Sequence, residues 1–344
     1  MKKAILYEKL KDNKVCCEAC YHHCIISDKK TGICGVRQNI DGDLYLLVYG
    51  KAISVNIDPV EKKPLFHFLP GQKAFSLGTL GCNFACAFCQ NWEISQAPKI
   101  SNTQYTIHNT DLWGEEWEPK KIVNYCKENN IPIIAYTYNE PTIWAEYALD
   151  TMKLAKKEGI KNIWVSNGFM KEKALNLIAP YLDAINIDLK SFSEDFYQKI
   201  CKGQLKPVKE NIKRIWKMGI WEEVTTLIIP GLNDSGKELK QIVKFLAEVS
   251  KDIPWHISAF YPSYKMLDRP PTPEETLITA YKIGKKAGLR YVYTGNIPDS
   301  NYESTFCPKC NTLIIERWGM KILENNLKNG RCPKCKTKIQ GIWK

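Results

Sequence analysis

The sequence predicts an α/β protein whose centre is an open, partial α/β barrel of the (βα)6 type. Amphipathic helical patterns lie at 142–158, 171–179, 208–218, 235–250 and 274–286. They alternate with short apolar runs that are typical of strands, at 74–79, 131–137, 160–166, 184–189, 224–229, 255–260 and 291–294. Strands joined by single helices pair in parallel through right-handed crossovers. Six or seven such units are too few for a closed eight-stranded barrel.

Local signals mark the ends of these helices. The helix at 142–158 ends at Gly159, the one at 171–179 stops before Pro180, and the one at 208–218 ends at Gly219. The helix at 235–250 begins with Ser235 and carries Glu238 three residues later, a pattern that predicts a capping box. These boundaries support the division into strand and helix units.

Two cysteine-rich segments flank the predicted barrel, so three regions are expected: 1–72, 73–300 and 301–344. The first is a Cys-rich β extension. After the turn signal Asp41-Gly42-Asp43 it holds apolar runs at 44–49 and 52–57, which predict short strands with a hairpin as one arrangement. The third region repeats Cys-Pro-Lys-Cys and predicts a zinc-ribbon-like module.

The sequence predicts a cytoplasmic location. No apolar stretch reaches the length of a membrane helix, and charge comes too early at the start for a secretory signal. Of the 14 cysteines, 12 fall in three groups. In a reducing compartment, grouped cysteines indicate metal ligands or catalytic thiols. Cys126 and Cys201 stand alone and are expected to be ordinary buried thiols.

The central cysteine group follows the first predicted barrel strand directly, as Cys82-x3-Cys86-x2-Cys89. Three thiolates on one short loop can hold an iron–sulfur cube and leave one of its four irons without a protein ligand. An open iron of this kind can bind a small chelate. A structural zinc site is the alternative, but such sites normally have four ligands, and the next histidine is His108.

The spacing, with Phe88 before the last cysteine, resembles the signature of the radical S-adenosylmethionine (SAM) superfamily. The resemblance implies a radical SAM barrel in which Cys82, Cys86 and Cys89 hold a catalytic [4Fe–4S] cluster. It also implies that the open iron chelates SAM. One-electron reduction then gives methionine and a 5′-deoxyadenosyl radical that abstracts a hydrogen atom from a substrate.

Polar residues at the ends of later strands match other positions of the family, where ligands of parallel α/β proteins gather. Asn139-Glu140 resembles part of the Gly-Gly-Glu segment that contacts the SAM amino group, with Tyr138-Asn139 in place of the glycines. Ser166-Asn167 resembles the segment that contacts ribose and carboxylate, and Asp188-Leu189-Lys190 an Asp-x-Lys pair of pyruvate formate-lyase activating enzymes. Asp188 as a helix cap and Asn167-Gly168 as a plain turn are the structural alternatives.

The likeness extends beyond the barrel. Gly50-Lys51-Ala52, the segment 58–68 and Cys89-Gln90-Asn91-Trp92 are similar to the AmmeMemoRadiSam-system radical SAM enzymes, as are the flanking cysteine groups. The resemblance implies Memo-like and AMMECR1-like partner proteins, together with an external one-electron donor. It does not name a reaction or a substrate.

The flanking cysteines predict two further metal sites. Cys17, Cys20, Cys24 and Cys34 supply four thiols, with Cys16 as an alternative first ligand and His22 or His23 as substitutes. Zinc and an auxiliary iron–sulfur cluster both suit such a closed site, with zinc slightly favoured. At the other end, Cys307, Cys310, Cys332 and Cys335 form two knuckles with the spacing of a zinc ribbon.

The net charge of +12 is concentrated partly at 305–344, a segment that contains nine Lys and Arg residues and only two Glu. No aromatic stacking platform accompanies these charges, so a solvated surface is favoured over nucleic-acid binding. His256 lies on a predicted strand and either faces the barrel interior or is buried in the core.

Three functions remain open from the sequence. The first is a radical SAM enzyme that modifies an unidentified substrate together with its system partners. The second is an activase of glycyl-radical enzymes, and the third is a non-catalytic iron–sulfur or zinc scaffold.

Overall fold

A computed structural model describes residues 1–100, 114–297 and 300–344. Its centre is an eight-stranded sheet in the order β16-β15-β14-β13-β12-β11-β9-β8. The seven strands from β9 to β16 run parallel, and β8 pairs antiparallel with β9 at one edge. Their bounds are β8 Ser54–Pro59, β9 Lys73–Gly78, β11 Ile133–Tyr136, β12 Lys161–Ser166, β13 Ala184–Asp188, β14 Trp221–Ile228, β15 Trp255–Ala259 and β16 Val292–Gly295. The expected open α/β architecture is confirmed, and the sheet does not close into a barrel.

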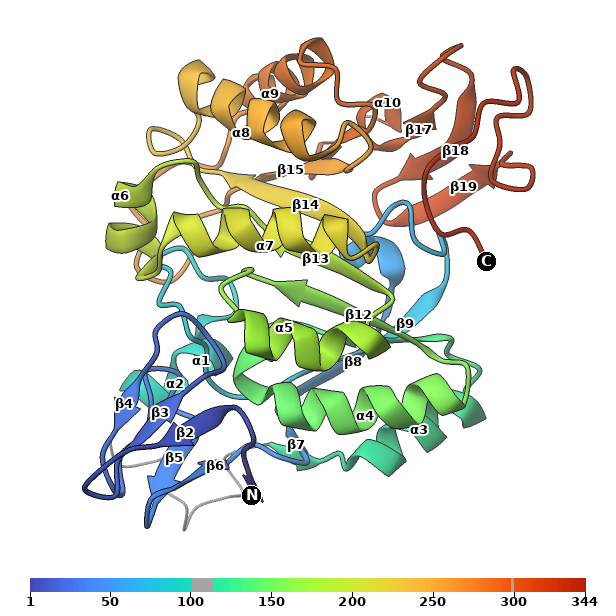
Figure 1. Ribbon diagram of the computed structural model, residues 1–344. Coiled ribbons are helices and arrows are strands. Elements are labelled where there is room, and N and C mark those ends of the chain that lie inside the picture. The colour runs from blue at the N-terminus through green and yellow to red at the C-terminus, as the bar shows by residue number, and fades with distance from the viewer. Residues whose placement is uncertain (101–113, 298–299) are drawn as a thin grey trace.

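Helices connect successive parallel strands and cover the face of the sheet that is turned to the viewer in Figure 1. The main ones are α3 Pro119–Glu128, α4 Ala145–Lys157, α5 Glu172–Ile178, α7 Leu205–Lys217, α8 Gly236–Val249 and α9 Glu274–Lys286. Five of them correspond to predicted helices. The helix α3 was not predicted from the sequence. Shorter helical segments are α1 Trp92–Ser95, α2 Ala97–Ile100, α6 Glu194–Phe196 and α10 Ser300–Glu303.

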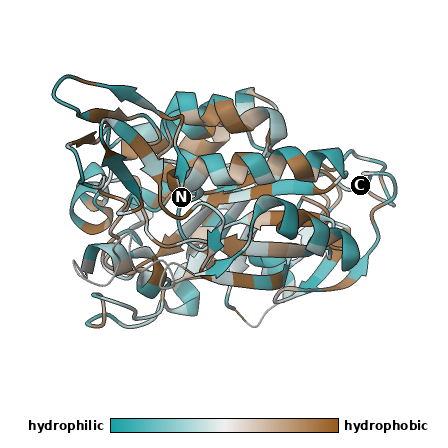
Figure 2. Cartoon of the chain, turned by 90° about the horizontal axis from the view of Figure 1, so that it is seen from below, coloured by the Kyte–Doolittle hydropathy of each residue, from teal (hydrophilic) through white to brown (hydrophobic). Residues whose placement is uncertain are grey.

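The parallel strands form because they are buried on both faces. All four residues of β11 are buried, and so are seven of the eight residues of β14. Strands of this kind need apolar residues almost continuously rather than in alternation. The helices carry the matching pattern, with hydrophobic residues toward the sheet and hydrophilic ones toward solvent (Figure 2). This packing places the carboxyl ends of the parallel strands around a common cavity.

The N-terminal region builds two small sheets rather than the expected hairpin of 44–49 with 52–57. In one of them, β5 Arg37–Ile40 and β6 Asp43–Leu46 pair across the tight turn at Asp41-Gly42, with β1 Lys2–Lys3 beside β6. Both turn residues have positive φ, as a two-residue hairpin turn requires. The other sheet contains β2 Tyr7–Lys9, β3 Val15–Cys17 and β4 Ile25–Ile26.

The second apolar run, 52–57, does not pair with the first run. Residues 51–52 form β7 (Lys51–Ala52), which pairs with β10 (Glu115–Glu116), and residues 54–59 form β8 of the main sheet. The main sheet therefore takes its edge strand from the segment 1–72, ahead of the first parallel strand.

The C-terminal region is a three-stranded antiparallel sheet of β17 Thr305–Phe306, β18 Leu313–Trp318 and β19 Lys321–Asn325. Figure 1 shows this module and the N-terminal module on opposite sides of the molecule. No helix within the described ranges is long and apolar enough to cross a membrane.

The predicted capping box at α8 forms only in part. The Ser235 hydroxyl accepts from the backbone N–H of Glu238 at 3.2 Å. The Glu238 carboxylate, however, accepts from the backbone N–H of Phe192 at 2.8 Å and from the hydroxyl of Ser191. It therefore fixes the loop that follows β13 instead of closing the helix start.

Candidate active site and metal centres

The cysteine loop 82–89 follows β9 and opens into a cavity of about 910 Å³. Cys82, Cys86 and Cys89 all line this cavity. Burial raises the pKa of the Cys82 thiol to about 12, and the nearby Lys99 partly opposes that rise. Thiols so reluctant to ionise become thiolates when a cation takes the place of the proton.

The three sulfurs are not close enough to one another to share a single ion. In the described part of the chain, these three do not form a group whose sulfurs all lie within 4.8 Å of one another. Sulfurs that share one zinc ion are about 3.8 Å apart, whereas sulfurs on separate irons of a cube are roughly 6 Å apart. Backbone N–H groups of Phe84 and Asn91 donate to Cys82 and Cys89, as is usual for metal-bound thiolates.

Cys201, which was expected to be an ordinary buried thiol, lies beside Cys86. Its side chain is hydrogen-bonded to that of Cys86 and contributes most to the raised pKa of Cys86. Cys201 does not line the cavity, however, so the cavity itself presents three thiols. The loop rests on this segment, because Ala85 N–H donates to the Cys201 carbonyl at 2.9 Å.

The residues that follow β11 hold the start of the cysteine loop in place. Asn139 Nδ2 donates to Thr79 Oγ1 at 3.0 Å and to the Gly81 carbonyl at 2.9 Å. Asn139 Oδ1 accepts from Trp144 Nε1 at 3.1 Å. Asn139 was predicted to bind cofactor. It lines the cavity, and its side chain also fixes the backbone that leads into Cys82.

Tyr138 adopts a backbone conformation that favours glycine, with φ of 70°. A bulky residue in this region costs about 1–3 kcal/mol and persists only where its surroundings hold it. Two contacts hold it here. Asn91 Nδ2 donates to the Tyr138 carbonyl at 2.8 Å, and the Tyr138 hydroxyl donates to Asp58 at 2.7 Å. Tyr138 therefore takes a glycine-like conformation at a position where the resembling segment has glycine.

Glu140 is a buried carboxylate whose oxygens already have partners. They accept from the backbone N–H and hydroxyl of Thr142 at 3.1 and 2.5 Å, from Ser166 Oγ at 2.9 Å and from the Asn167 backbone N–H at 2.7 Å. Burial raises the pKa of Glu140, and these hydrogen bonds oppose that rise. The side chain lines the cavity and ties the ends of β11 and β12 together.

Asn167 connects the end of β12 to the cysteine loop. Its Nδ2 donates to Asn83 Oδ1 at 2.8 Å, directly after Cys82. Its backbone and side chain also close a local turn, since Asn167 Oδ1 accepts from Phe169 N–H at 3.0 Å. Both the turn and the cavity-lining position expected from the sequence are therefore present.

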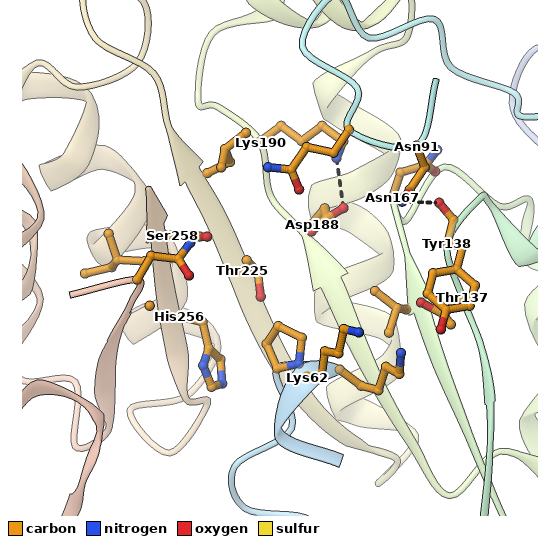
Figure 3. Close-up of a pocket in the computed structure, with 18 of the residues that line it drawn as sticks. Lys62, Asn91, Thr137, Tyr138, Asn167, Asp188, Lys190, Thr225, His256 and Ser258 are labelled. Carbon is orange, nitrogen blue, oxygen red and sulfur yellow. Dashed lines mark hydrogen bonds and ion pairs between the residues drawn. The ribbon is translucent and has the colours of Figure 1, made fainter. Parts of the chain in front are cut away.

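Asp188 and Lys190 form an ion pair at the end of β13, with Nζ and Oδ2 2.8 Å apart (Figure 3). Burial alone would lower the pKa of Lys190, but the charge of Asp188, and the negative charge that Cys86 and Cys201 would carry as thiolates, raise it well above its ordinary value. Lys190 is thus a permanent cation on the cysteine side of the cavity. In Figure 3, Tyr138 and Asn167 lie on one side of this pair and His256 on the other.

His256 was expected either to face the barrel interior or to be buried in the core. His256 Nε2 lies 2.6 Å from Glu223 Oε2, and Glu223 also accepts from the backbone N–H groups of Phe66 and His67. His256 therefore both has a buried partner and faces the cavity. Other residues of the cavity were not predicted from the sequence: Lys62, Lys63 and Thr225 line it, as do Trp318 and Met320 of the C-terminal module. Their joint position arises from tertiary packing, which leaves no local sequence signal.

The C-terminal cysteines form a compact four-thiol site. Cys307 and Cys335 sulfurs are 3.5 Å apart, those of Cys310 and Cys332 are 3.6 Å apart, and all four lie within 4.8 Å of one another. This spacing matches the roughly 3.8 Å expected around one tetrahedral zinc ion. The site fits a single metal ion.

The N-terminal thiols are arranged more widely. Four of these cysteines lie near one another. Negative charge on Cys17, Cys24 or Cys34 would raise the pKa of Cys20, which shows that all three lie close to it. Cys16 instead points to Glu18 at 3.7 Å and belongs to a separate group with Glu18 and His23. His22 Nε2 lies 2.8 Å from the Asn83 carbonyl, and His23 Nε2 lies 2.7 Å from Glu18. The alternative ligands therefore have other partners.

Comparisons with known proteins agree with this site. Residues 77–246 match the Radical SAM superfamily. An uncharacterized protein of Methanocaldococcus jannaschii is 45% identical over 319 residues, which are 92% of each chain. A second protein of that organism, named provisionally as a glycyl-radical enzyme activating enzyme, is 25% identical over 61% of this chain and 76% of its own.

Among solved structures, a domain of pyruvate-formate lyase-activating enzyme from Bacteroides vulgatus is 22% identical. It covers 47% of this chain and 98% of its own, with a TM-score of 0.41. The matched superfamily segment begins in β9 and contains the cysteine loop and the polar ends of β11, β12 and β13. The chain is an enzyme of the radical SAM superfamily.

Proposed function

We propose that this enzyme cleaves SAM reductively and uses the resulting 5′-deoxyadenosyl radical to take a hydrogen atom from a substrate bound in the 910 Å³ cavity. One observation carries the proposal: three cysteines of one loop open into a cavity lined by the polar ends of three adjacent strands. Cys82, Cys86 and Cys89 would hold a [4Fe–4S] cluster, which supplies the low-potential electron when bound.

The balance of the reaction needs one electron from an external donor. One electron added to SAM breaks the bond between its sulfur and C5′ and gives methionine and the 5′-deoxyadenosyl radical. That radical takes a hydrogen atom from the substrate, which leaves 5′-deoxyadenosine and a substrate radical.

The chain's own residues would bind and enclose the reactants. Lys190 places a cation near the cysteine loop, and Asp188 holds its ammonium at 2.8 Å. Phe84 and Phe88 line the same cavity and limit the water that reaches the loop. Lys62 and His256 lie in another part of the cavity and offer polar contacts to a substrate.

The first test is anaerobic reconstitution with iron and sulfide, followed by dithionite and SAM and by chromatography for 5′-deoxyadenosine. Wild-type protein is expected to form this product, and Cys86→Ala is not. Cys126→Ala is the matched control, because Cys126 is a buried thiol far from the other cysteine groups in sequence. A loaded and reducible cluster that yields no 5′-deoxyadenosine would overturn the proposal.

We also propose zinc as the metal of the C-terminal module, supported by sulfur separations of 3.5 and 3.6 Å. Memo-like and AMMECR1-like proteins are proposed as partners on sequence resemblance alone, that of Gly50-Lys51-Ala52, 58–68, 89–92 and the flanking cysteine groups. Co-purification of the three proteins under anaerobic conditions would test this partnership.

Activation of a glycyl-radical enzyme is the second candidate function, favoured by the relative named for that activity. In that case the hydrogen atom would come from a backbone glycine of a protein. Mixing the reduced enzyme and SAM with a candidate protein should then produce the glycyl-radical doublet in the EPR spectrum.

A further inference from the structure

We infer that Cys17, Cys20, Cys24 and Cys34 bind a second [4Fe–4S] cluster, and that this cluster passes electrons to the one held by Cys82, Cys86 and Cys89. The existence of the second cluster stands on the N-terminal residues alone. Its role in electron transfer rests on the proposed function.

The spacing of the sulfurs distinguishes the two candidate metals. The C-terminal sulfurs all lie within 4.8 Å of one another, as they must to share one zinc ion. In the described part of the chain, no three of the four N-terminal sulfurs meet that limit. The same is true of Cys82, Cys86 and Cys89. The N-terminal sulfurs are thus too far apart to share one ion as the C-terminal sulfurs can, and a cube does not require that closeness because its sulfurs bind separate irons.

Backbone hydrogen bonds indicate that these sulfurs are metal ligands and not packed thiols. The sulfurs of Cys17, Cys20 and Cys34 each accept from the N–H two residues later, those of Ala19, His22 and Val36. Cys82 and Cys89 receive the same kind of bond. The buried Cys126 shows no such donor.

Enclosure also suits a permanent cluster. The buried guanidinium of Arg37 lies near Cys17 and Cys34, and its charge is paired with the carboxylate of Glu146. Cys17, Cys20 and Cys34 are each less than a tenth exposed. Four protein ligands leave no iron open for a substrate. A closed, buried cluster can carry electrons but cannot bind the reactant.

The N-terminal site lies directly against the cysteine loop of the active site. A Cβ atom on Gly81, next to Cys82, would come within 2.4 Å of the Cys34 carbonyl. Lys99 acts electrostatically on both Cys34 and Cys82. His22 Nε2 lies 2.8 Å from the carbonyl of Asn83, and Cys20 forms an isolated β-bridge with Met170, just after β12. These contacts create a short protein path between the two groups of sulfurs.

The electron balance is simple. An external one-electron donor reduces the N-terminal cluster. That cluster is oxidised again when it gives one electron to the active-site cluster, which then reduces SAM.

Metal content gives the first test. After anaerobic reconstitution, wild-type protein is expected to hold about eight iron and eight sulfide ions per chain, that is, two cubes, and one zinc. A variant with Cys82, Cys86 and Cys89 all changed to Ala should keep about four iron ions. Cys20→Ser with Cys24→Ser should also keep about four, while Cys16→Ser, the adjacent control, keeps all eight.

The outcomes separate the two claims. A triple-alanine variant with no iron, or with a second zinc in its place, would overturn the N-terminal cluster. Because that variant retains the N-terminal cysteines, its iron content is informative even if SAM is never cleaved. A loss of SAM cleavage in wild type with eight iron ions present would instead count against the proposed function.

Magnetic coupling tests the electron path. The EPR spectrum of fully reduced wild-type protein should differ from the sum of the two single-cluster variants, because close paramagnetic clusters broaden each other's signals. The Cys20→Ser, Cys24→Ser variant should also show slower reduction of the active-site cluster by dithionite. A simple sum of spectra with an unchanged rate of reduction would exclude the relay.

Discussion

The carboxylate of Glu140 accepts a hydrogen bond from the backbone N–H of Asn167 at 2.7 Å and so joins the ends of β11 and β12. Glu140→Gln would present amide hydrogens to donors that now meet carboxylate oxygens. The expected cost is about 1–3 kcal/mol of the free energy of unfolding, together with weaker SAM binding. Urea denaturation and equilibrium SAM binding measure the two effects, and exposed Glu128→Gln is the control. Unchanged stability would contradict the bracing role.

Lys190 should raise the reduction potential of the active-site cluster. Reduction adds negative charge, and the buried ammonium beside Cys86 stabilises that charge. Lys190→Met is therefore expected to lower the midpoint potential, as measured by an EPR-monitored redox titration. Lys62→Met removes the same charge from a half-exposed side chain in another part of the cavity, away from Lys190 in Figure 3, and should leave the potential nearly unchanged. Equal shifts in both variants would contradict the prediction.

His67 should make the fold sensitive to acid. Burial lowers its pKa to about 4, from 6.5 in an unfolded chain. Between these pH values the unfolded state binds a proton that the folded state does not. The free energy of unfolding therefore falls as the pH falls through this window, by about 3 kcal/mol in total. The full contribution is present above the unfolded pKa.

Urea titrations from pH 7 to pH 4 would measure that loss. His67→Gln should show a shallower decline than wild type, whatever its stability at pH 7. Parallel curves for wild type and His67→Gln would show that another group is responsible.

Glu222 carries the opposite pH dependence. Both of its carboxylate oxygens are buried and have no hydrogen-bond partner among the described residues, and burial raises its pKa well above the ordinary value. The folded state therefore holds a proton that the unfolded state releases above its ordinary pKa. Glu222→Met should stabilise the protein at pH 8 by about 1–3 kcal/mol, and by less as the pH falls toward 4.5. A Met variant less stable than wild type at pH 8 would contradict this expectation.

The C-terminal site should hold one zinc ion that the module needs for its fold. Its cysteines Cys307 and Cys332 pack with Phe66 and Tyr293 in one apolar cluster. Cys310→Ser should lose one equivalent of zinc by elemental analysis and should increase proteolysis within 305–344. Cys126→Ser should keep the zinc. A Cys310→Ser protein with full zinc content would show that Cys310 is not a ligand.

The regular part of the fold could be predicted because its signals are local. All seven parallel strands were recognised from short apolar runs, and five of the main helices from their periodicity and end signals. The helix α3 was missed, since its buried face has only Ile122, Val123 and Cys126 after Pro119. The partner of β8 could not be predicted, because pairing with β9 depends on tertiary contacts that the run 52–57 does not reveal.

The site divides in the same way. The spacing of Cys82, Cys86 and Cys89 identifies the loop without any structure. The placement of Cys201 against Cys86 and of Trp318 beside the cavity joins residues far apart in the chain, and no local pattern indicates it. The positive φ of Tyr138 is also hidden in the sequence, because tyrosine ordinarily avoids that conformation.

The segment that precedes β9 is held in place by hydrogen bonds to residues near the C-terminal end of the chain. Ile342 N–H donates to the His67 carbonyl at 2.8 Å, and Leu69 N–H donates to the Ile342 carbonyl at 2.7 Å. His67 also contacts Gln340, 273 positions later. During synthesis, the strands can assemble before these contacts form, because Gln340 and Ile342 have not yet been added to the chain. The part of the cavity lined by Pro64 and Phe66 is therefore among the last to form. In a nascent chain, the cysteine loop is exposed before the cavity can enclose a substrate.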